Sequence, residues 1–270
     1  MPTLARADLE SLLRVRQLDR TLTTALAPLD PYDEYAVAPA GIMALDASLG
    51  GGLPRGQLSE LIGPRSSGRT SLLHQILAAA TGRGELVALV DALDTFDVAS
   101  ASAAGIDLER LLWVRGHVVP NPGMCRDVNP RAVEQALKAL MLILQAGNFG
   151  CVVLDVADAP GEAIRRLPFT TWLRLQRVLE GSQTACILVG TEPMARSSAG
   201  LSVRLERQKA EGRRQKAEGG RQKAEGKRQK AEGLGRMFKG LDLELHVISA
   251  RGHSREGVCV SLAAEASPDV

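Results

Sequence analysis

A short apolar segment, a glycine-containing loop and an amphipathic segment follow one another in the first third of the chain, and no other feature constrains the fold as strongly. Residues 57–62 are typical of a buried strand, residues 63–70 read GPRSSGRT, and residues 70–80 carry apolar side chains at helical spacing. In such a loop the backbone N–H groups converge on an anion, and the start of the following helix adds partial positive charge. The sequence therefore predicts a phosphate-binding loop, the P-loop, at residues 63–70.

The P-loop departs from the pattern G-x-x-x-x-G-K-[ST] at one position, because Arg69 stands where lysine is required. Arginine keeps the charge but presents a wide planar fork instead of a compact point charge, so we expect an altered γ-phosphate geometry. The Thr70 hydroxyl and Asp155, which closes an apolar strand, are the expected Mg²⁺ ligands if nucleotide binds; a direct Thr70–Asp155 hydrogen bond is the alternative. The candidate nucleotide-binding residues are Gly63, Arg65, Ser66, Ser67, Gly68, Arg69 and Thr70.

Apolar strand-like runs alternate with helical segments after the P-loop. This alternation predicts an α/β fold in which a mostly parallel central sheet has helices on both faces, with ligands at the carboxyl ends of the strands. An antiparallel edge is expected from the last strand-like runs. The expected strands are 86–91, 111–114, 151–155, 185–189, 201–205, 241–248 and 257–262, and the expected helices are 130–145 and 171–179.

Two segments stand apart from this core. Residues 7–27 show an apolar stripe at near-helical spacing, and a linker follows at 28–39. The unit RQKAEG plus one residue recurs between Arg207 and Gly233. This segment holds ten Lys or Arg and four Glu, so its net charge is +6; because the whole chain has a net charge of +2, the remaining residues carry −4. We expect a solvated, partly disordered insertion without core residues. The predicted organisation is 1–40 helix and linker, 41–206 core, 207–233 insertion, and 234–270 completion of the sheet.

Composition narrows the class of protein further. Hydrophobic residues make up 45% of the 270 residues and aromatic residues only 3%, so the core must be aliphatic. No run of 18 or more apolar residues and no signal-peptide pattern occurs, which predicts a cytoplasmic protein without membrane contact. The cysteines show no C-x-x-C or zinc spacing. We interpret all four as reduced packing residues: Cys125, Cys151, Cys186 and Cys259.

The segment leading into the P-loop, residues 41–56 (GIMALDASLGGGLPRG), resembles the start of the RecA recombinase core. The similarity continues, with gaps, through residues 90–92, 104–112, Asp155 and 202–205, and reaches about residue 262. This resemblance implies a RecA-like P-loop NTPase core, with ATP and Mg²⁺ as the expected cofactors and an empty nucleotide site as the alternative.

The departures from RecA all affect catalysis or DNA contact. The position of the family's catalytic glutamate, two residues after the second-strand Asp91, is Leu93 here, and Asp94 beside it is the one substitute base. A general base contributes a rate factor of about 10²–10⁴. The family's glutamine after the fifth strand is replaced by Gly190 and Thr191, and the DNA-binding loop that follows is shortened. The sequence therefore favours a protein that is not a working enzyme.

This combination resembles the ImuA group of degenerate RecA-like proteins. The resemblance implies a nucleoid-associated accessory scaffold of DNA repair and SOS-type translesion synthesis, with an ImuB-like polymerase-related protein and RecA as partners. Weak nonspecific nucleic-acid binding through the basic repeat is a further expectation. Two alternatives stay open: an active RecA-like DNA-dependent ATPase with Asp94 as base, and a SulA-like inhibitor of cell division.

Overall fold

The computed structural model describes residues 36–116, 128–195, 199–207, 240–250 and 259–265. The predicted helix at 7–27 and all but the first residue of the predicted insertion at 207–233 lie outside the described residues. Within the described ranges, no helix is both long and apolar enough to cross a membrane.

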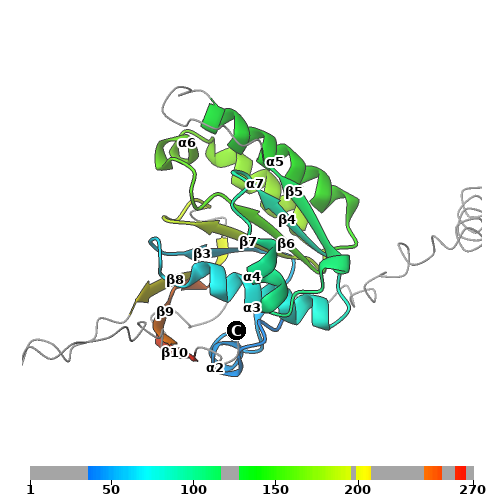
Figure 1. Ribbon diagram of the computed structural model, residues 1–270. Coiled ribbons are helices and arrows are strands. Elements are labelled where there is room, and N and C mark those ends of the chain that lie inside the picture. The colour runs from blue at the N-terminus through cyan, green and yellow to red at the C-terminus, as the bar shows by residue number, and fades with distance from the viewer. Residues whose placement is uncertain (1–35, 117–127, 196–198, 208–239, 251–258, 266–270) are drawn as a thin grey trace, which may run out of the picture.

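A single large sheet of eight strands organises the molecule, in the order β10-β9-β8-β3-β7-β6-β4-β5 (Figure 1). The strands from β8 to β5 are parallel, whereas β9 and β10 add an antiparallel edge beyond β8. This is the predicted mostly parallel sheet with an antiparallel edge. The strands are β3 Leu58–Ile62, β4 Val87–Asp91, β5 Leu111–Arg115, β6 Cys151–Asp155, β7 Ala185–Gly190, β8 Ala199–Arg207, β9 Gly240–Ala250 and β10 Cys259–Glu265.

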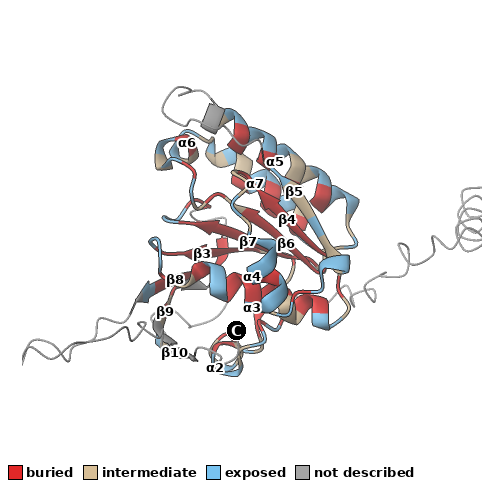
Figure 2. Cartoon of the chain, viewed as in Figure 1, coloured by how far each residue is buried: buried red, intermediate tan, exposed pale blue. Residues whose placement is uncertain are grey.

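Helices cover both faces of the sheet (Figure 2), so β3, β4 and β7 are buried at every position, and β4 and β7 are almost continuous apolar runs. One core cluster packs α2 and α3 against the sheet, and a second packs α5 and α7 against the other face. The helices are α2 Met43–Ser48, α3 Arg69–Gly82, α4 Val98–Ala103, α5 Val128–Ala146, α6 Gly161–Arg165 and α7 Phe169–Leu179, with a short 3₁₀ turn, η2, at Leu108–Arg110.

A two-stranded ribbon extends the core toward the N-terminus. β1 (Val37–Ala38) pairs antiparallel with β2 (Leu53–Pro54), and the side chains of Ala38 and Ala40 are buried. Val37, Ala38 and Ala40 lie in the predicted N-terminal unit of residues 1–40. The packed core therefore includes residues before position 41.

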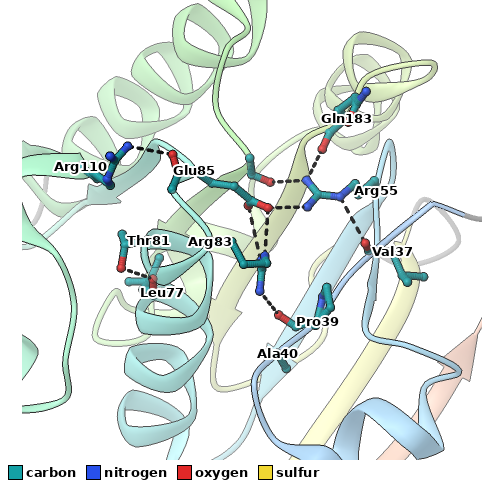
Figure 3. Close-up of polar contacts among 12 residues, drawn as sticks. Val37, Pro39, Ala40, Arg55, Leu77, Thr81, Arg83, Glu85, Arg110 and Gln183 are labelled. Carbon is teal, nitrogen blue, oxygen red and sulfur yellow. Dashed lines mark hydrogen bonds and ion pairs between the residues drawn. The ribbon is translucent and has the colours of Figure 1, made fainter. Parts of the chain in front are cut away.

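A network of arginines and a glutamate joins the amino ends of the strands (Figure 3). Arg55 donates to the carbonyls of Val37, Gly150 and Gln183 and to the Glu85 carboxylate at 2.7 Å. Arg83 donates to the same carboxylate at 3.0 Å. The network ties the segments that enter β3, β4, β6 and β7, so it fixes the starts of the central strands.

The cysteine prediction holds for two of the three described residues and is wrong for the third. Cys151 and Cys186 are buried in β6 and β7, and burial raises the pKa of Cys151 to about 12. Cys259 instead lies exposed at the start of β10. Its apolar sequence context indicated burial, but β10 is the last strand of the sheet among the described residues, so its outer edge has no described neighbour. Cys125 lies outside the described residues.

Candidate functional site

The P-loop joins the end of β3 to the start of α3, as the sequence predicts. Ser66 has φ 61° and Gly68 has φ 86°, so two residues of the loop adopt the left-handed conformation. Alternation of right- and left-handed residues turns successive backbone N–H groups toward one point, which is the geometry of an anion-binding nest. The α3 helix begins at Arg69, so its N-terminus faces the same loop.

The beginning of the P-loop is too crowded for any side chain at Gly63. A Cβ atom there would lie 2.5 Å from Ser67 Oγ and 2.7 Å from the Leu205 carbonyl oxygen. The Ser67 hydroxyl is buried and has no hydrogen-bond partner among the described residues. A buried hydroxyl without a partner carries a desolvation cost, and a phosphate oxygen is one group that would satisfy it. The Ser67 hydroxyl, like the backbone N–H groups of the loop, therefore fits an anion.

The Arg69 side chain is directed at a strand end. Its Nη1 donates to the Gly190 carbonyl oxygen at 2.6 Å, and the residue is 8% exposed. Burial lowers the pKa of Arg69, while Asp155 and Asp158 act in the opposite direction. The guanidinium at the position of the motif lysine therefore donates a hydrogen bond to the last residue of β7.

A second arginine links the P-loop to the segment after β6. Arg65 donates through Nε and Nη2 to Asp158 Oδ1, at 3.0 and 2.6 Å. The Arg65 side chain is 80% exposed, so this contact lies at the surface of the site. Both cationic side chains of the loop therefore have partners at the carboxyl ends of neighbouring strands.

Asp155 ends β6, one strand away from β7 and two from β3. Its Oδ1 accepts from the backbone N–H of Ala157 at 2.9 Å, and Thr70 is exposed in the first turn of α3. The direct hydrogen bond between Thr70 and Asp155, the alternative to a shared Mg²⁺, is not among the contacts of the described residues. Burial raises the pKa of Asp155 to about 6, with Asp91 adding to the effect. The carboxylate is suited to a cation, because an ionised buried group gains from a nearby positive charge.

Position 93, the expected place of a catalytic glutamate, holds an apolar side chain, and the neighbouring carboxylate of Asp94 is already paired. Leu93 packs partly buried against the core cluster beneath α5 and α7. Asp94, at φ 57°, accepts two hydrogen bonds from Arg115, at 2.8 and 2.7 Å. The Arg115 hydrogen bonds lower the pKa of Asp94. A carboxylate held in this way is a weak base for activating water.

An aromatic cluster positions the arginine that holds Asp94. The guanidinium of Arg115 lies 4.6 Å from the centre of the Trp113 ring, and Phe96 meets Trp113 edge-on with ring centres 5.3 Å apart. His74 of α3 meets Phe96 in turn, with ring centres 5.7 Å apart. Sequence analysis missed this cluster, because its members come from three separate elements and carry no common spacing.

A buried carboxylate supports the loop that follows β7. Glu60 in the middle of β3 is 2% exposed and accepts from the backbone N–H groups of Met194 and Ala195, each at 2.7 Å. Its second oxygen accepts from the Ser202 hydroxyl at 2.7 Å. The available signal was a glutamate inside an apolar strand, since a buried charge requires hydrogen-bond partners.

Comparisons with known proteins agree with this arrangement. The model of the RecA N-terminal domain matches residues 26–161. The RecA protein of Thermus thermophilus is 34% identical over an alignment of 174 residues, and the match covers 59% of this chain and 47% of that protein. The RecA protein of Chlorobium chlorochromatii is 38% identical over 120 residues, covering 44% and 30% of the two chains. The chain spans less than half the length of these relatives.

A solved structure is also similar. The KaiC-like protein of Pyrococcus horikoshii OT3 is 19% identical, with a TM-score of 0.49, and the match covers 84% of this chain and 94% of that one.

Proposed function

The chain belongs to the RecA N-terminal domain family, and from this premise we propose that it is a non-hydrolytic accessory protein of DNA repair. The proposed role is that of the ImuA group: a scaffold in damage-induced mutagenesis that binds an ImuB-like polymerase-related protein and RecA. The RecA-like fold supplies the frame, and the nucleotide site keeps its backbone while its catalytic side chains are replaced.

One observation carries this proposal: the guanidinium of Arg69 is buried against the Gly190 carbonyl oxygen. In a P-loop of the usual pattern the lysine reaches the β- and γ-phosphates. Arg69 reaches a strand end, so phosphate would have to compete with a buried hydrogen bond for this cation. A nucleotide held only by the backbone of the loop would lack the charge that stabilises the transferring phosphoryl group.

The water-activating group is missing as well. Leu93 has no titratable group, and Asp94 is paired with Arg115. Loss of a general base lowers the rate by about 10²–10⁴. ATP with Mg²⁺ remains the ligand class that the loop backbone, Thr70 and Asp155 could hold. In this proposal bound nucleotide would stabilise the fold and would not be turned over.

Steady-state ATP hydrolysis by the purified full chain tests the enzymatic half of the proposal. The assay contains Mg²⁺, with and without single-stranded DNA, and uses a RecA protein as positive control. The Asp155→Ala variant reports contaminating ATPase activity. We expect no turnover by the wild-type chain above this variant. Turnover that depends on Asp155 and rises with single-stranded DNA would establish the recombinase-type ATPase instead.

The scaffold half is tested in cells and by co-purification. Deleting the gene should lower the frequency of damage-induced mutation, and the full chain should co-purify with the polymerase-related partner from damaged cells. An unchanged mutation frequency would refute the accessory role. Filamentation on overexpression, without a mutagenesis defect, would favour the inhibitor of cell division.

A further inference from the structure

Three metal-binding side-chain types meet on the antiparallel edge of the sheet, where β9 lies two strands from β3. His246 of β9 and Cys259 of β10 are directly paired residues of the antiparallel ladder. Glu244 lies two residues before His246 on the same strand, so the two side chains share a face of the sheet. The pairing of β9 with β10 thus brings a carboxylate, an imidazole and a thiol to one place.

The donor atoms of these three residues are close together. The ligand atoms of Glu244, His246 and Cys259 all lie within 4.8 Å of one another. His246 Nε2 and Glu244 Oε2 are 3.6 Å apart. Around a tetrahedral zinc ion, bond lengths of about 2.0–2.3 Å place ligand atoms about 3.3–3.8 Å apart. Shifts of about 1 Å in side-chain rotamers would close the trio around one ion.

We propose that Glu244, His246 and Cys259 form a Zn²⁺ site with three protein ligands and a fourth position open to solvent. Thiolate and imidazole ligands favour zinc over Mg²⁺ or Ca²⁺, which prefer oxygen. Access from solvent is provided, because Cys259 is exposed and the other two residues are half-buried. The ligands stand on paired strands, so the backbone holds them in register without metal.

The neighbouring charges are compatible with a dication. On β8, Arg204 pairs with His246 and Glu206 pairs with Glu244, so one cation and one anion border the trio. Their charges cancel, and the Glu244 carboxylate with the Cys259 thiolate supply two negative charges for Zn²⁺. The other described cysteines cannot replace Cys259, because burial raises the pKa values of the Cys151 and Cys186 thiols.

The test is metal binding by the full chain, reduced and stripped of metal. Zn²⁺ is titrated in competition with a chromophoric chelator, and Co²⁺ serves as a spectroscopic probe of a thiolate ligand. We expect one Zn²⁺ per chain and a thiolate-to-cobalt charge-transfer absorption. Cys259→Ser should abolish that absorption and weaken Zn²⁺ binding at least about 100-fold, because outer-shell partners alone change metal affinity about 10–100-fold.

Matched variants separate this site from adventitious binding. His246→Ala and Glu244→Gln should also weaken Zn²⁺ binding, whereas Glu162→Gln on α6 and Cys125→Ser should leave it unchanged. Circular dichroism of the metal-free variants verifies folding, and Glu244→Gln preserves the shape of the side chain. Absence of stoichiometric binding by the wild-type chain, or equal affinity in wild type and Cys259→Ser, would overturn the proposal.

Discussion

Arginines at the two ends of the parallel strands are bound in different ways. At the amino ends, Arg55 is enclosed by three backbone carbonyls and Glu85, and both side chains of the pair are about 10% exposed or less. At the carboxyl ends, Arg69 has one carbonyl partner, and Arg65 reaches Asp158 from a largely exposed position. The arginine at the amino ends is therefore fully enclosed by protein acceptors, whereas the arginines at the carboxyl ends are only partly so.

This difference follows from the geometry of a parallel α/β sheet. Ligands bind beyond the carboxyl ends of the strands, so polar groups collect there without full mutual compensation. The signs of such an incomplete site are the raised pKa of Asp155 and the Ser67 hydroxyl, which has no hydrogen-bond partner in the described part of the chain. A change at the amino ends should cost stability, and a change at the carboxyl ends should alter ligand binding or pH dependence.

The largest effect is expected from Arg55→Ala. Removing the arginine takes one of the two arginine partners from the Glu85 carboxylate and one donor from each of the carbonyls of Val37, Gly150 and Gln183. Removing one partner of a buried pair costs about 3–5 kcal/mol, and we expect this loss in the free energy of unfolding by urea. Arg166→Ala is the control, because its pair with Glu162 is about 70% exposed and should contribute less than about 1 kcal/mol. Equal effects would remove the distinction between the two ends.

Asp155→Asn is expected to stabilise the protein at pH 7. Burial raises the pKa of Asp155 from 3.8 to about 6, so the ionised form is disfavoured in the folded state. Wild-type stability should fall as the pH rises from about 4 through 6, because the folded state binds the extra proton. One pKa unit corresponds to about 1.4 kcal/mol, which gives a gain of about 2–3 kcal/mol for the variant at pH 7.

Thermal and urea unfolding between pH 4 and pH 8 measure the Asp155 effect. The difference between variant and wild type should disappear near pH 4, where the wild-type carboxyl is also neutral. Glu162→Gln controls for the removal of one negative charge from the surface. A variant that is less stable than wild type at pH 7 would mean that the ionised carboxylate is well compensated in the folded protein.

Arg69→Lys should tighten nucleotide binding by about tenfold, equivalent to about 1.4 kcal/mol. A lysine cannot reproduce the planar fork at the Gly190 carbonyl, and it offers a compact charge to phosphate. Fluorescence titration with a labelled ADP measures the affinity, and Arg174→Lys, an exposed exchange on α7, is the control. An unchanged affinity would indicate that the loop is closed by contacts other than that of Arg69.

The smallest effect is expected from Arg65→Ala. The ion pair with Asp158 is exposed on the arginine side, so its contribution to stability should stay below about 1 kcal/mol and decrease with added salt. Urea unfolding at low and high salt checks both expectations. If the free energy of unfolding fell by more than about 2 kcal/mol at both salt concentrations, Arg65 would be a structural residue like Arg55.

Much of the fold could be predicted from local pattern alone. Hydrophobic periodicity predicts the order of strand, P-loop and helix and the alternation of strands and helices that follows. It does so because burial on both faces of a parallel sheet favours apolar runs. The arginine at the motif-lysine position, Arg69, and the apolar residue Leu93 are likewise visible in the sequence. Near-neighbour chemistry therefore determined the fold class and the position of the candidate site.

The tertiary structure decided where the charged side chains point and which distant residues meet. Arg69 donates a hydrogen bond to the Gly190 carbonyl, 121 positions later in the sequence. Arg115 donates to the Asp94 carboxylate, 21 positions earlier. Cys259 was predicted to be buried, yet it is exposed beside His246, because its environment depends on the place of β10 in the sheet. Strand order and register are non-local, so no periodicity within a segment encodes them.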